Sequence, residues 1–147
     1  MSNSRDIPFE TTHLVRDTCL CLHTQRAARA LARRFDEALR PVGLTNGQFS
    51  LLMSLNRPQP ATMGSVASLL AMDRTTLTAA LKPLERRGLV EVRPDPKDRR
   101  SRLIVLTPEG LSLLSRAVPI WEAAHKDVEA LTSGEAERLR LHLRALS

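Results

Sequence analysis

The sequence predicts a mainly α-helical protein with a small β-hairpin, arranged as a winged helix-turn-helix core flanked by N- and C-terminal helices. Apolar residues recur at three- and four-residue intervals along most of the 147 residues, which is the period of an α-helix. Two segments rich in Val, Ile and Leu, 89–93 and 102–106, bracket a basic loop at 94–101, as in a hairpin. Aromatic residues make up only 3% of the chain, so Leu, Val and Ala must form the core.

The N-terminal third is predicted to hold an irregular tail and one helix. Residues 1–10 are polar and lack a periodic pattern. From about Thr11 to Leu39, apolar residues recur on one helical face, and Pro41-Val-Gly43 ends the helix.

Capping residues mark the short helices of the middle third. Thr45 and Gln48 have the spacing of a capping box, and Thr62 and Asp73 are predicted N-caps of the next two helices. The second of these has a leucine face, and Gly88 is placed to end it as the residue after the C-cap.

The C-terminal third is predicted to hold two helices. Thr107-Pro108 is an N-cap followed by a proline at the first helical position, and the helix runs to about 131. Its apolar positions form a heptad-like seam that predicts packing against another helix: Leu111, Leu114, Val118, Trp121, His125 and Val128. A capping box at Thr132–Glu135 is expected to open the last helix. Pro83 and Pro119 are expected to bend or end the helices that contain them.

Composition limits the function classes. The net charge is +6 and the pI about 10.6, which favours a polyanionic partner. We expect a cytoplasmic protein, because no apolar run is long enough to span a membrane and the N-terminus has no secretory signal. Two cysteines, Cys19 and Cys21, are too few for a disulfide framework or a zinc site, so no metal or cofactor is expected.

Three motifs together resemble the MarR family of regulators over about residues 12–147. They are Asp95-Pro-Lys-Asp-Arg-Arg100 leading into Leu-Thr-Pro-Glu-Gly110, Asp73-Arg-Thr-Thr with Leu84-Glu-Arg-Arg-Gly-Leu-Val90, and Gly43-Leu-Thr with Gln48-Phe49. The resemblance implies one domain over 1–147, with a DNA-binding region at 45–107 and helical dimerisation regions at 11–42 and 108–147. It also implies a homodimer that binds a pseudopalindromic operator in double-stranded DNA, usually as a repressor, and leaves it on a chemical signal.

The residues predicted to contact DNA lie on the recognition helix and the wing. Inward-facing Leu77 and Leu81 leave polar neighbours exposed, and the wing loop is cationic enough for a narrow minor groove. These residues are Arg74, Thr75, Thr76, Thr78, Lys82, Lys97, Asp98, Arg99 and Arg100. Arg99 is the candidate for insertion into the groove, and Asp98 is expected to hold a neighbouring arginine. Ala79 stands where many members of the family carry an arginine, so guanine readout from that position is lost.

Residues 73–102 hold nine Lys and Arg against five Asp and Glu, a net charge of +4. Most of the chain's positive charge is therefore expected on the DNA-binding face.

Two kinds of signal are compatible with the sequence. One branch of the family senses organic hydroperoxides through a cysteine on the first helix, and Cys19 or Cys21 could serve here, although this chain has no tyrosine to bond that cysteine. The alternative is that both cysteines are small buried core residues, which is the commonest role of a free cysteine. The other signal is a small-molecule effector in a pocket near His23, Arg26 and Phe49.

Two other function classes fit the sequence less well. An enzyme that uses Cys21 and a histidine would need an aligned base and an oxyanion site, and no glycine-rich turn or nucleophile elbow is present. A winged-helix module for protein contacts would fit a neutral or acidic wing better than this basic one. The sequence therefore favours a DNA-binding regulator without catalytic residues.

Overall fold

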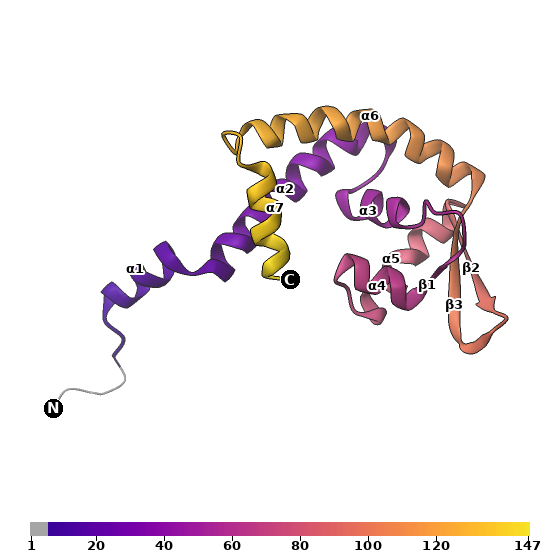
Figure 1. The fold of residues 1–147 in the computed structure, drawn as a ribbon, viewed down its shortest axis with the longest axis horizontal. Coiled ribbons are helices and arrows are strands. Elements are labelled where there is room, and N and C mark those ends of the chain that lie inside the picture. The colour runs from indigo at the N-terminus through magenta and orange to yellow at the C-terminus, as the bar shows by residue number, and fades with distance from the viewer. Residues whose placement is uncertain (1–5) are drawn as a thin grey trace.

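The computed structural model describes residues 6–147, and Figure 1 shows how its helices and three-stranded sheet are arranged. The elements in chain order are α1 (Phe9–Thr18), α2 (Leu20–Leu39), the 3-10 turn η1 (Arg40–Val42), α3 (Asn46–Ser54), β1 (Ala61–Thr62), α4 (Met63–Leu70), α5 (Arg74–Arg86), β2 (Val90–Asp95), β3 (Asp98–Leu106), α6 (Pro108–Ala130) and α7 (Ala136–Ala145). The mainly helical winged helix-turn-helix prediction is confirmed.

The core lies where α2 and α6 meet the block formed by α3, α4, α5 and the sheet (Figure 1). Its fully buried side chains are aliphatic, as the low aromatic content predicted: Leu39, Leu52, Val66, Leu77, Leu81, Leu84 and Ile104. Neither α1 nor α7 contains a buried residue, so the two ends of the chain contribute little to this core.

The sheet has the strand order β1-β3-β2, and both pairs are antiparallel. The hairpin is longer than predicted, because the strands continue through the expected loop and leave only Pro96 and Lys97 at its tip. Strand β1 was not predicted. Its two residues align with Leu103 and Ile104 of β3, and the prolines that precede it gave no strand signal.

Most predicted caps are present. Thr45 and Gln48 form a complete capping box, and the side chains of Thr62, Asp73 and Thr107 each accept a backbone hydrogen bond at a helix start. At the end of α5, Gly88 has φ +72°. Its N–H donates to Glu85 O and the Leu89 N–H to Leu84 O, which is the Schellman arrangement.

The capping box predicted at Thr132–Glu135 is wrong. Helix α7 starts after Glu135, which makes no side-chain cap, and the Thr132 hydroxyl donates back to Glu129 O at 2.6 Å. Ser133 and Gly134 both have positive φ, so the chain reverses sharply there and Thr132 lies outside the first turn of α7.

The single helix predicted from Thr11 to Leu39 is two helices. Helix α1 starts earlier, at Phe9, so the described part of the predicted tail is shorter than expected; residues 1–5 lie outside the described residues. The break falls at Cys19, where ψ is 112°. Because the Cys19 N–H and C=O keep their bonds to Val15 and His23, the break is confined to one residue.

The two internal prolines do not end their helices. Helix α5 continues past Pro83 to Arg86, because the proline removes one hydrogen bond while its own carbonyl still accepts from Arg87 N. Helix α6 runs through Pro119 as one curved helix (Figure 1).

The seam on α6 packs against α2 of the same chain, as shown by the rings of Phe35 and His125, whose centroids are 6.4 Å apart. Leu111 does not belong to this seam, because it is 48% exposed; Leu113 and Ala117 are buried instead.

A polar contact fixes the joint between α2 and α3. The Asp36 carboxylate accepts hydrogen bonds from the Asn46 backbone N–H at 2.7 Å and from its side-chain amide at 2.8 Å. The backbone bond, followed by the amide bond, lowers the pKa of Asp36 below its ordinary value of 3.8. No helix among the described residues combines the length and apolar character needed to cross a membrane.

Gly110 is predicted to be required for packing at the start of α6. A Cβ there would collide with the Leu89 carbonyl oxygen and press on the Leu106 side chain. We expect Gly110→Ala to lower the free energy of unfolding by about 1–3 kcal/mol, measured by urea denaturation. The control is Gly47→Ala in α3, where an added Cβ meets nothing within 4 Å. Equal denaturation midpoints for the two variants would contradict this packing.

The Asp36 contact predicts a pH-dependent stability. Because the pKa of Asp36 is lowered in the folded state, its stabilisation is present above about pH 4 and is lost as the pH falls through the folded pKa. We expect Asp36→Ala to cost about 1 kcal/mol at pH 6.5, allowing for solvent screening, and much less at pH 2.5. Urea denaturation at both pH values tests this. Glu37→Ala is the control, because within residues 6–147 Glu37 pairs with exposed Arg40 alone. An equal cost of Asp36→Ala at the two pH values would refute the charge-assisted contact.

Candidate nucleic-acid interface

The first turn of α5 is built around Asp73. Its two carboxylate oxygens accept from the Thr76 backbone N–H at 2.7 Å and the Thr76 hydroxyl at 2.8 Å. These bonds, the backbone one first, lower the pKa of Asp73, so the cap is charged at neutral pH. Thr76 is therefore held in the cap of α5.

The exposed face of α5 matches the sequence prediction. Leu77 and Leu81 are buried, whereas Arg74, Thr75 and Lys82 are exposed. Thr78 is also exposed, but its hydroxyl donates to Arg74 O at 2.7 Å. Among the described residues, the Thr75 hydroxyl has no such bond, so it is the threonine most available to a ligand.

The wing tip is shaped by two aspartates that bind backbone. Asp95 accepts from the Lys97 N–H and Asp98 from the Arg100 N–H, each at 2.9 Å. The expectation that Asp98 holds an arginine side chain is wrong: among the described residues it forms no ion pair, because its oxygen turns back to its own strand. Lys97, Arg99 and Arg100 remain exposed.

A groove with a cavity volume of about 620 Å³ lies between α5 and the wing. Arg74 reaches over Gly64, where a missing side chain leaves room for the guanidinium. The groove is lined by Thr62, Met63, Gly64, Arg74, Thr78, Asp95, Asp98, Arg100, Ser101 and Arg102. Of the nine predicted residues it brings together Arg74 and Thr78 of the recognition helix with Asp98 and Arg100 of the wing, and its charged lining is three arginines and two aspartates.

The C-terminal end of α5 is tied to the joint after α2. Arg87 Nη1 donates to the Gly43 carbonyl at 2.9 Å, and Gly43 has a φ of +69°. This contact could not be predicted from the sequence, because 44 residues separate the partners and neither shows a local signal.

The expected effector site is only partly assembled in the chain. Phe49 faces Trp121, with ring centroids 6.0 Å apart and planes 16° apart, beside a cavity of about 420 Å³. His23 and Arg26 do not line it; both are exposed on α2, and the His23 ring bonds to Cys19 O at 2.7 Å. The predicted grouping is therefore wrong in this chain, because Phe49 lies on α3, beneath the other end of α2.

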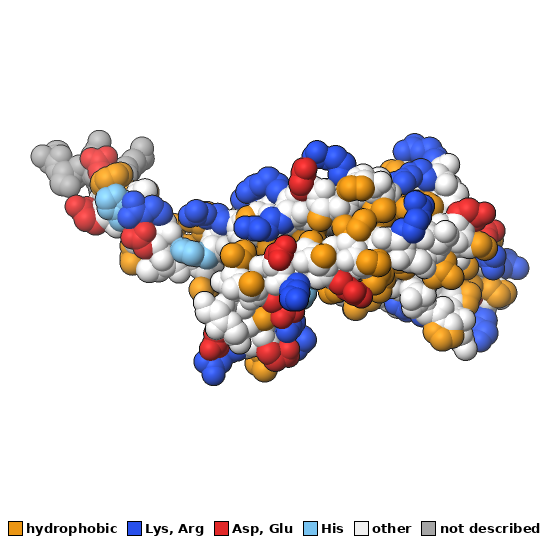
Figure 2. Space-filling view, turned by 90° about the horizontal axis from the view of Figure 1, so that it is seen from above, with side chains coloured by type: hydrophobic (Ala, Val, Ile, Leu, Met, Phe, Trp, Pro, Cys, Tyr) orange, Lys and Arg blue, Asp and Glu red, His pale blue; other side chains and the backbone are white. Residues whose placement is uncertain are grey.

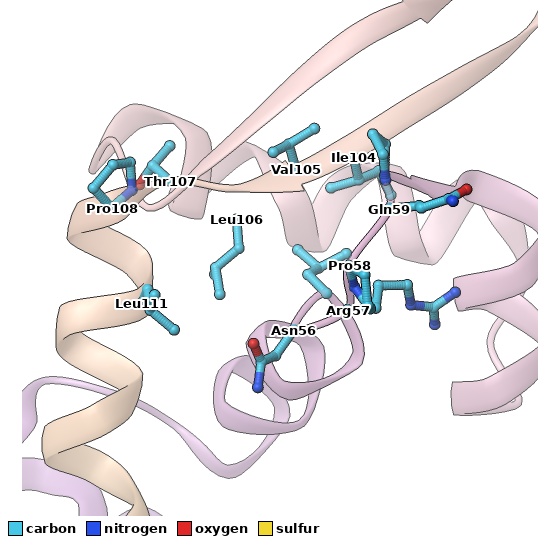
Figure 3. Close-up of a pocket in the computed structure, with 12 residues that line it drawn as sticks. Asn56, Arg57, Pro58, Gln59, Ile104, Val105, Leu106, Thr107, Pro108 and Leu111 are labelled. Carbon is cyan, nitrogen blue, oxygen red and sulfur yellow. The ribbon is translucent and has the colours of Figure 1, made fainter.

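A second cavity, of about 480 Å³, lies between the α3–β1 loop and the start of α6 (Figure 3). Leu106 and Leu111 extend into it from the sheet and from α6, whereas the Arg57 guanidinium points away from them. Arg57 Nε instead donates to Ser54 O at 2.9 Å. The sequence predicted no ligand-binding residue here; Thr107, Pro108 and Leu111 were predicted only to start and pack α6.

The two cysteines differ in position. Cys19 caps α2, where its sulfur accepts from the Leu22 N–H at 3.5 Å, and Cys21 is exposed in the first turn. In this chain Cys21 is not a core residue, and Cys19 is only partly covered.

Comparison with known proteins agrees with this geometry. The family model described as "MarR family" matches residues 44–101. The transcriptional regulator MosR from M. tuberculosis, in a crystal structure with DNA, is similar to this chain. The two chains are 40% identical in sequence and superpose with a TM-score of 0.81, and the match covers 88% of this chain and 93% of MosR. The transcriptional repressor CouR, bound to a 23-mer DNA duplex, is 30% identical, with a TM-score of 0.72, over 90% of this chain and 92% of CouR.

A curated relative matches over a shorter length. The transcriptional activatory protein BadR of Rhodopseudomonas palustris is 38% identical over 88 residues, which is 58% of this chain and 50% of BadR. The match thus spans about half the length of that relative. The fold, the wing and these similarities agree with the expectation of a regulator rather than an enzyme. The chain belongs to the MarR family of winged helix-turn-helix transcriptional regulators.

Proposed function

We propose that the protein is a homodimeric transcriptional repressor that binds a pseudopalindromic operator and is released by a small molecule. The observation that carries the proposal is the groove between α5 and the wing, where exposed cations from both elements face one surface. A recognition helix fits the major groove of DNA, and a narrow cationic loop fits the minor groove.

Five of the predicted contacts have distinct roles in this proposal. Thr75 meets base edges or phosphate at the start of α5, and Lys82 meets phosphate further along. Arg99 enters the minor groove from the wing tip, while Asp98 shapes the turn that presents it. Sequence readout then depends on Arg74 and Thr75, because Ala79 offers no hydrogen-bond donor to a base.

Arg99→Ala tests the wing. If Arg99 enters the minor groove, the variant should lose about 1–3 kcal/mol of specific binding and show a shallower salt dependence. Fluorescence anisotropy with the DNA flanking the protein's own gene, at several salt concentrations, measures both. Arg116→Ala on α6 removes the same charge from an exposed position and is the control. Unchanged affinity and salt slope in Arg99→Ala would remove the wing from the interface. Absence of specific binding by the parent protein would favour the protein-contact module.

The proposed homodimer explains the apolar side chains at the two ends of the chain. Helices α1 and α7 contain no fully buried residue in the single chain, and Figure 2 shows apolar side chains lying among charged ones over the long helices. The exposed apolar residues of these ends are Ile7, Phe9, Leu14, Val15, Leu20, Leu131, Leu139, Leu141, Leu143 and Leu146. Surface of this kind requires a partner, and a second copy brings the same helices.

Sedimentation equilibrium tests the dimer. We expect the parent protein to sediment as a dimer, and Leu141→Glu, at a position 60% exposed in the single chain, to weaken association at least about tenfold. Ser112→Glu on the exposed side of α6 is the control. A monomeric parent protein at micromolar concentration would contradict the dimer and with it the pseudopalindromic operator.

Release by a small molecule is supported by the cavity beside Phe49 and Trp121, which lies at the junction of α3, α4 and α6. A ligand that favours one arrangement of this junction would change the affinity for DNA. The sign of regulation is proposed from CouR, which is described as a repressor, whereas BadR is described as an activator.

A thiol switch is the second candidate, and the break at Cys19 favours it. Residues two apart point to nearly opposite sides of a regular helix, but Cys19 lies outside the regular helix, so this geometry does not separate it from Cys21. A hydroperoxide would oxidise one thiolate to sulfenic acid and leave as an alcohol. The other thiol would then displace water to form a disulfide, within one chain or across the dimer.

Binding to the same DNA with and without organic hydroperoxide tests this switch. If it operates, peroxide should reduce the affinity, dithiothreitol should restore it, and Cys19→Ser and Cys21→Ser should each remove the response. If peroxide does not change the affinity for DNA, the cysteines have a structural role and the proposal of release by a small molecule stands.

A further inference from the structure

We propose that the groove between α5 and the wing binds a phosphate of the DNA backbone at the end next to α4, and that Arg102 is the residue that holds it. This inference rests on the proposed binding of DNA through α5 and the wing. It adds a contact that neither the recognition helix nor the wing tip provides. The groove has a volume of about 620 Å³, and Arg102 lines it from strand β3.

The shape of a duplex brings one sugar-phosphate strand to this groove. In B-DNA, a major groove and the minor groove next to it are separated by a single sugar-phosphate strand. A protein that places a helix in the major groove and a wing in the adjacent minor groove therefore lies on both sides of that strand. Because α5 forms one wall of the groove and the wing hairpin another, the strand between the two DNA grooves must pass through it.

Arg102 faces the groove because of its position on β3. Side chains alternate between the two faces of a strand, so Arg102 shares a face with the buried Ile104, two residues further along. Its neighbour Leu103 aligns with Thr62 of β1, directly before α4. Arg102 therefore lines the groove at the end next to the start of α4.

The two ends of the groove differ in charge. Asp95 and Asp98 are aligned with each other at the wing-tip end, where Arg100 is the accompanying arginine. Arg102 lies four residues from Asp98, which is about 13 Å along an extended strand. Arg74 reaches over the first turn of α4 in the opposite wall and adds positive charge at the Arg102 end. A phosphate is repelled by carboxylates and attracted by guanidinium groups, so the α4 end is its favoured position.

The Arg102 guanidinium is available to a phosphate. Its side chain is exposed, and within residues 6–147 it forms no ion pair. An arginine suits this contact because its parallel N–H groups donate to two phosphate oxygens at once. The residue is thus placed to hold the backbone without reading a base.

Three variants test the phosphate site: Arg102→Ala, Arg102→Lys, which keeps the charge, and Arg93→Ala as the matched control. Arg93 is exposed on the same hairpin and aligns with Leu103, so it lies on the sheet face opposite to Arg102. Its loss changes the net charge by the same amount. Fluorescence anisotropy at several salt concentrations measures binding to two duplexes of equal length, one from the DNA flanking the protein's own gene and one of random sequence.

We expect Arg102→Ala to lower the affinity for both duplexes by a similar factor, about five- to tenfold, because a phosphate contact does not depend on sequence. The slope of log affinity against log salt should become shallower by about 0.9. Arg102→Lys should restore most of the affinity, and Arg93→Ala should change neither quantity. A loss confined to the gene-flanking duplex, an equal loss in Arg93→Ala, or no loss in Arg102→Ala would each overturn the inference.

Neutral linkages locate the phosphate. A methylphosphonate replaces one phosphate at a time along the gene-flanking duplex. The parent protein should lose affinity at the linkage that Arg102 holds, and Arg102→Ala should lose nothing further there. Losses that add at every linkage would refute the site.

The same measurements separate this inference from the proposed function. Weaker binding by Arg99→Ala with no effect of Arg102→Ala would keep DNA binding through the wing and refute the phosphate site. A parent protein that binds neither duplex would refute both. Circular dichroism establishes that the variants are folded, which is expected because both arginines, at 93 and 102, are exposed.

Discussion

Burial of the leucine face of α5 is the constraint on which the rest of the molecule depends. Leu77, Leu81 and Leu84 are almost completely buried, and this fixes the rotation of the helix about its axis. With the rotation fixed, Arg74 and Thr75 must face outward. The hydrophobic effect thus determines which side chains of α5 face solvent, and no polar contact is needed to orient them.

The wing is held to α5 by a second, more local set of contacts. The left-handed Gly88 ends the helix and turns the chain into β2, and the Thr107 hydroxyl donates to the Gly88 carbonyl at 2.6 Å. The Thr107 N–H donates to Leu89 O, and the absence of a side chain at Gly110 lets α6 approach that carbonyl. The same few residues therefore end the recognition helix, close the hairpin and start α6. Because these contacts are shared, the distance between the wing and α5 is set by the packed fold and not by a flexible loop.

The sequence predicted what local chemistry determines. Capping side chains, the glycine after α5 and the leucine period each act within a few residues, so Thr45, Asp73 and Gly88 could be placed without a structure. The predictions fail where contacts between distant parts of the chain determine the structure. Strand β1 exists only because β3 is beside it, and the break at Cys19 has no proline or glycine to announce it. Of the candidate site, the exposed cations of α5 and the wing could be predicted from the sequence. The effector grouping could not, because residues 23 and 49 lie on different helices whose relative placement no local pattern encodes.

The position of the cavity beside Phe49 and Trp121 bears on how a ligand could act at a distance from DNA. Phe49 belongs both to this cavity and to a smaller one, of about 110 Å³, which also contacts Leu39 and Asn46. Asn46 is the residue that Asp36 holds at the α2–α3 joint, and Gly43 in the same joint accepts the bond from Arg87 at the end of α5. The cavity, the joint and the recognition helix are thus linked by direct contacts. Contact alone does not couple sites; a ligand must also bind two arrangements of this joint with different affinity. The Asp36–Asn46 and Gly43–Arg87 hydrogen bonds are the direct links through which a second arrangement of this joint would reach the end of α5.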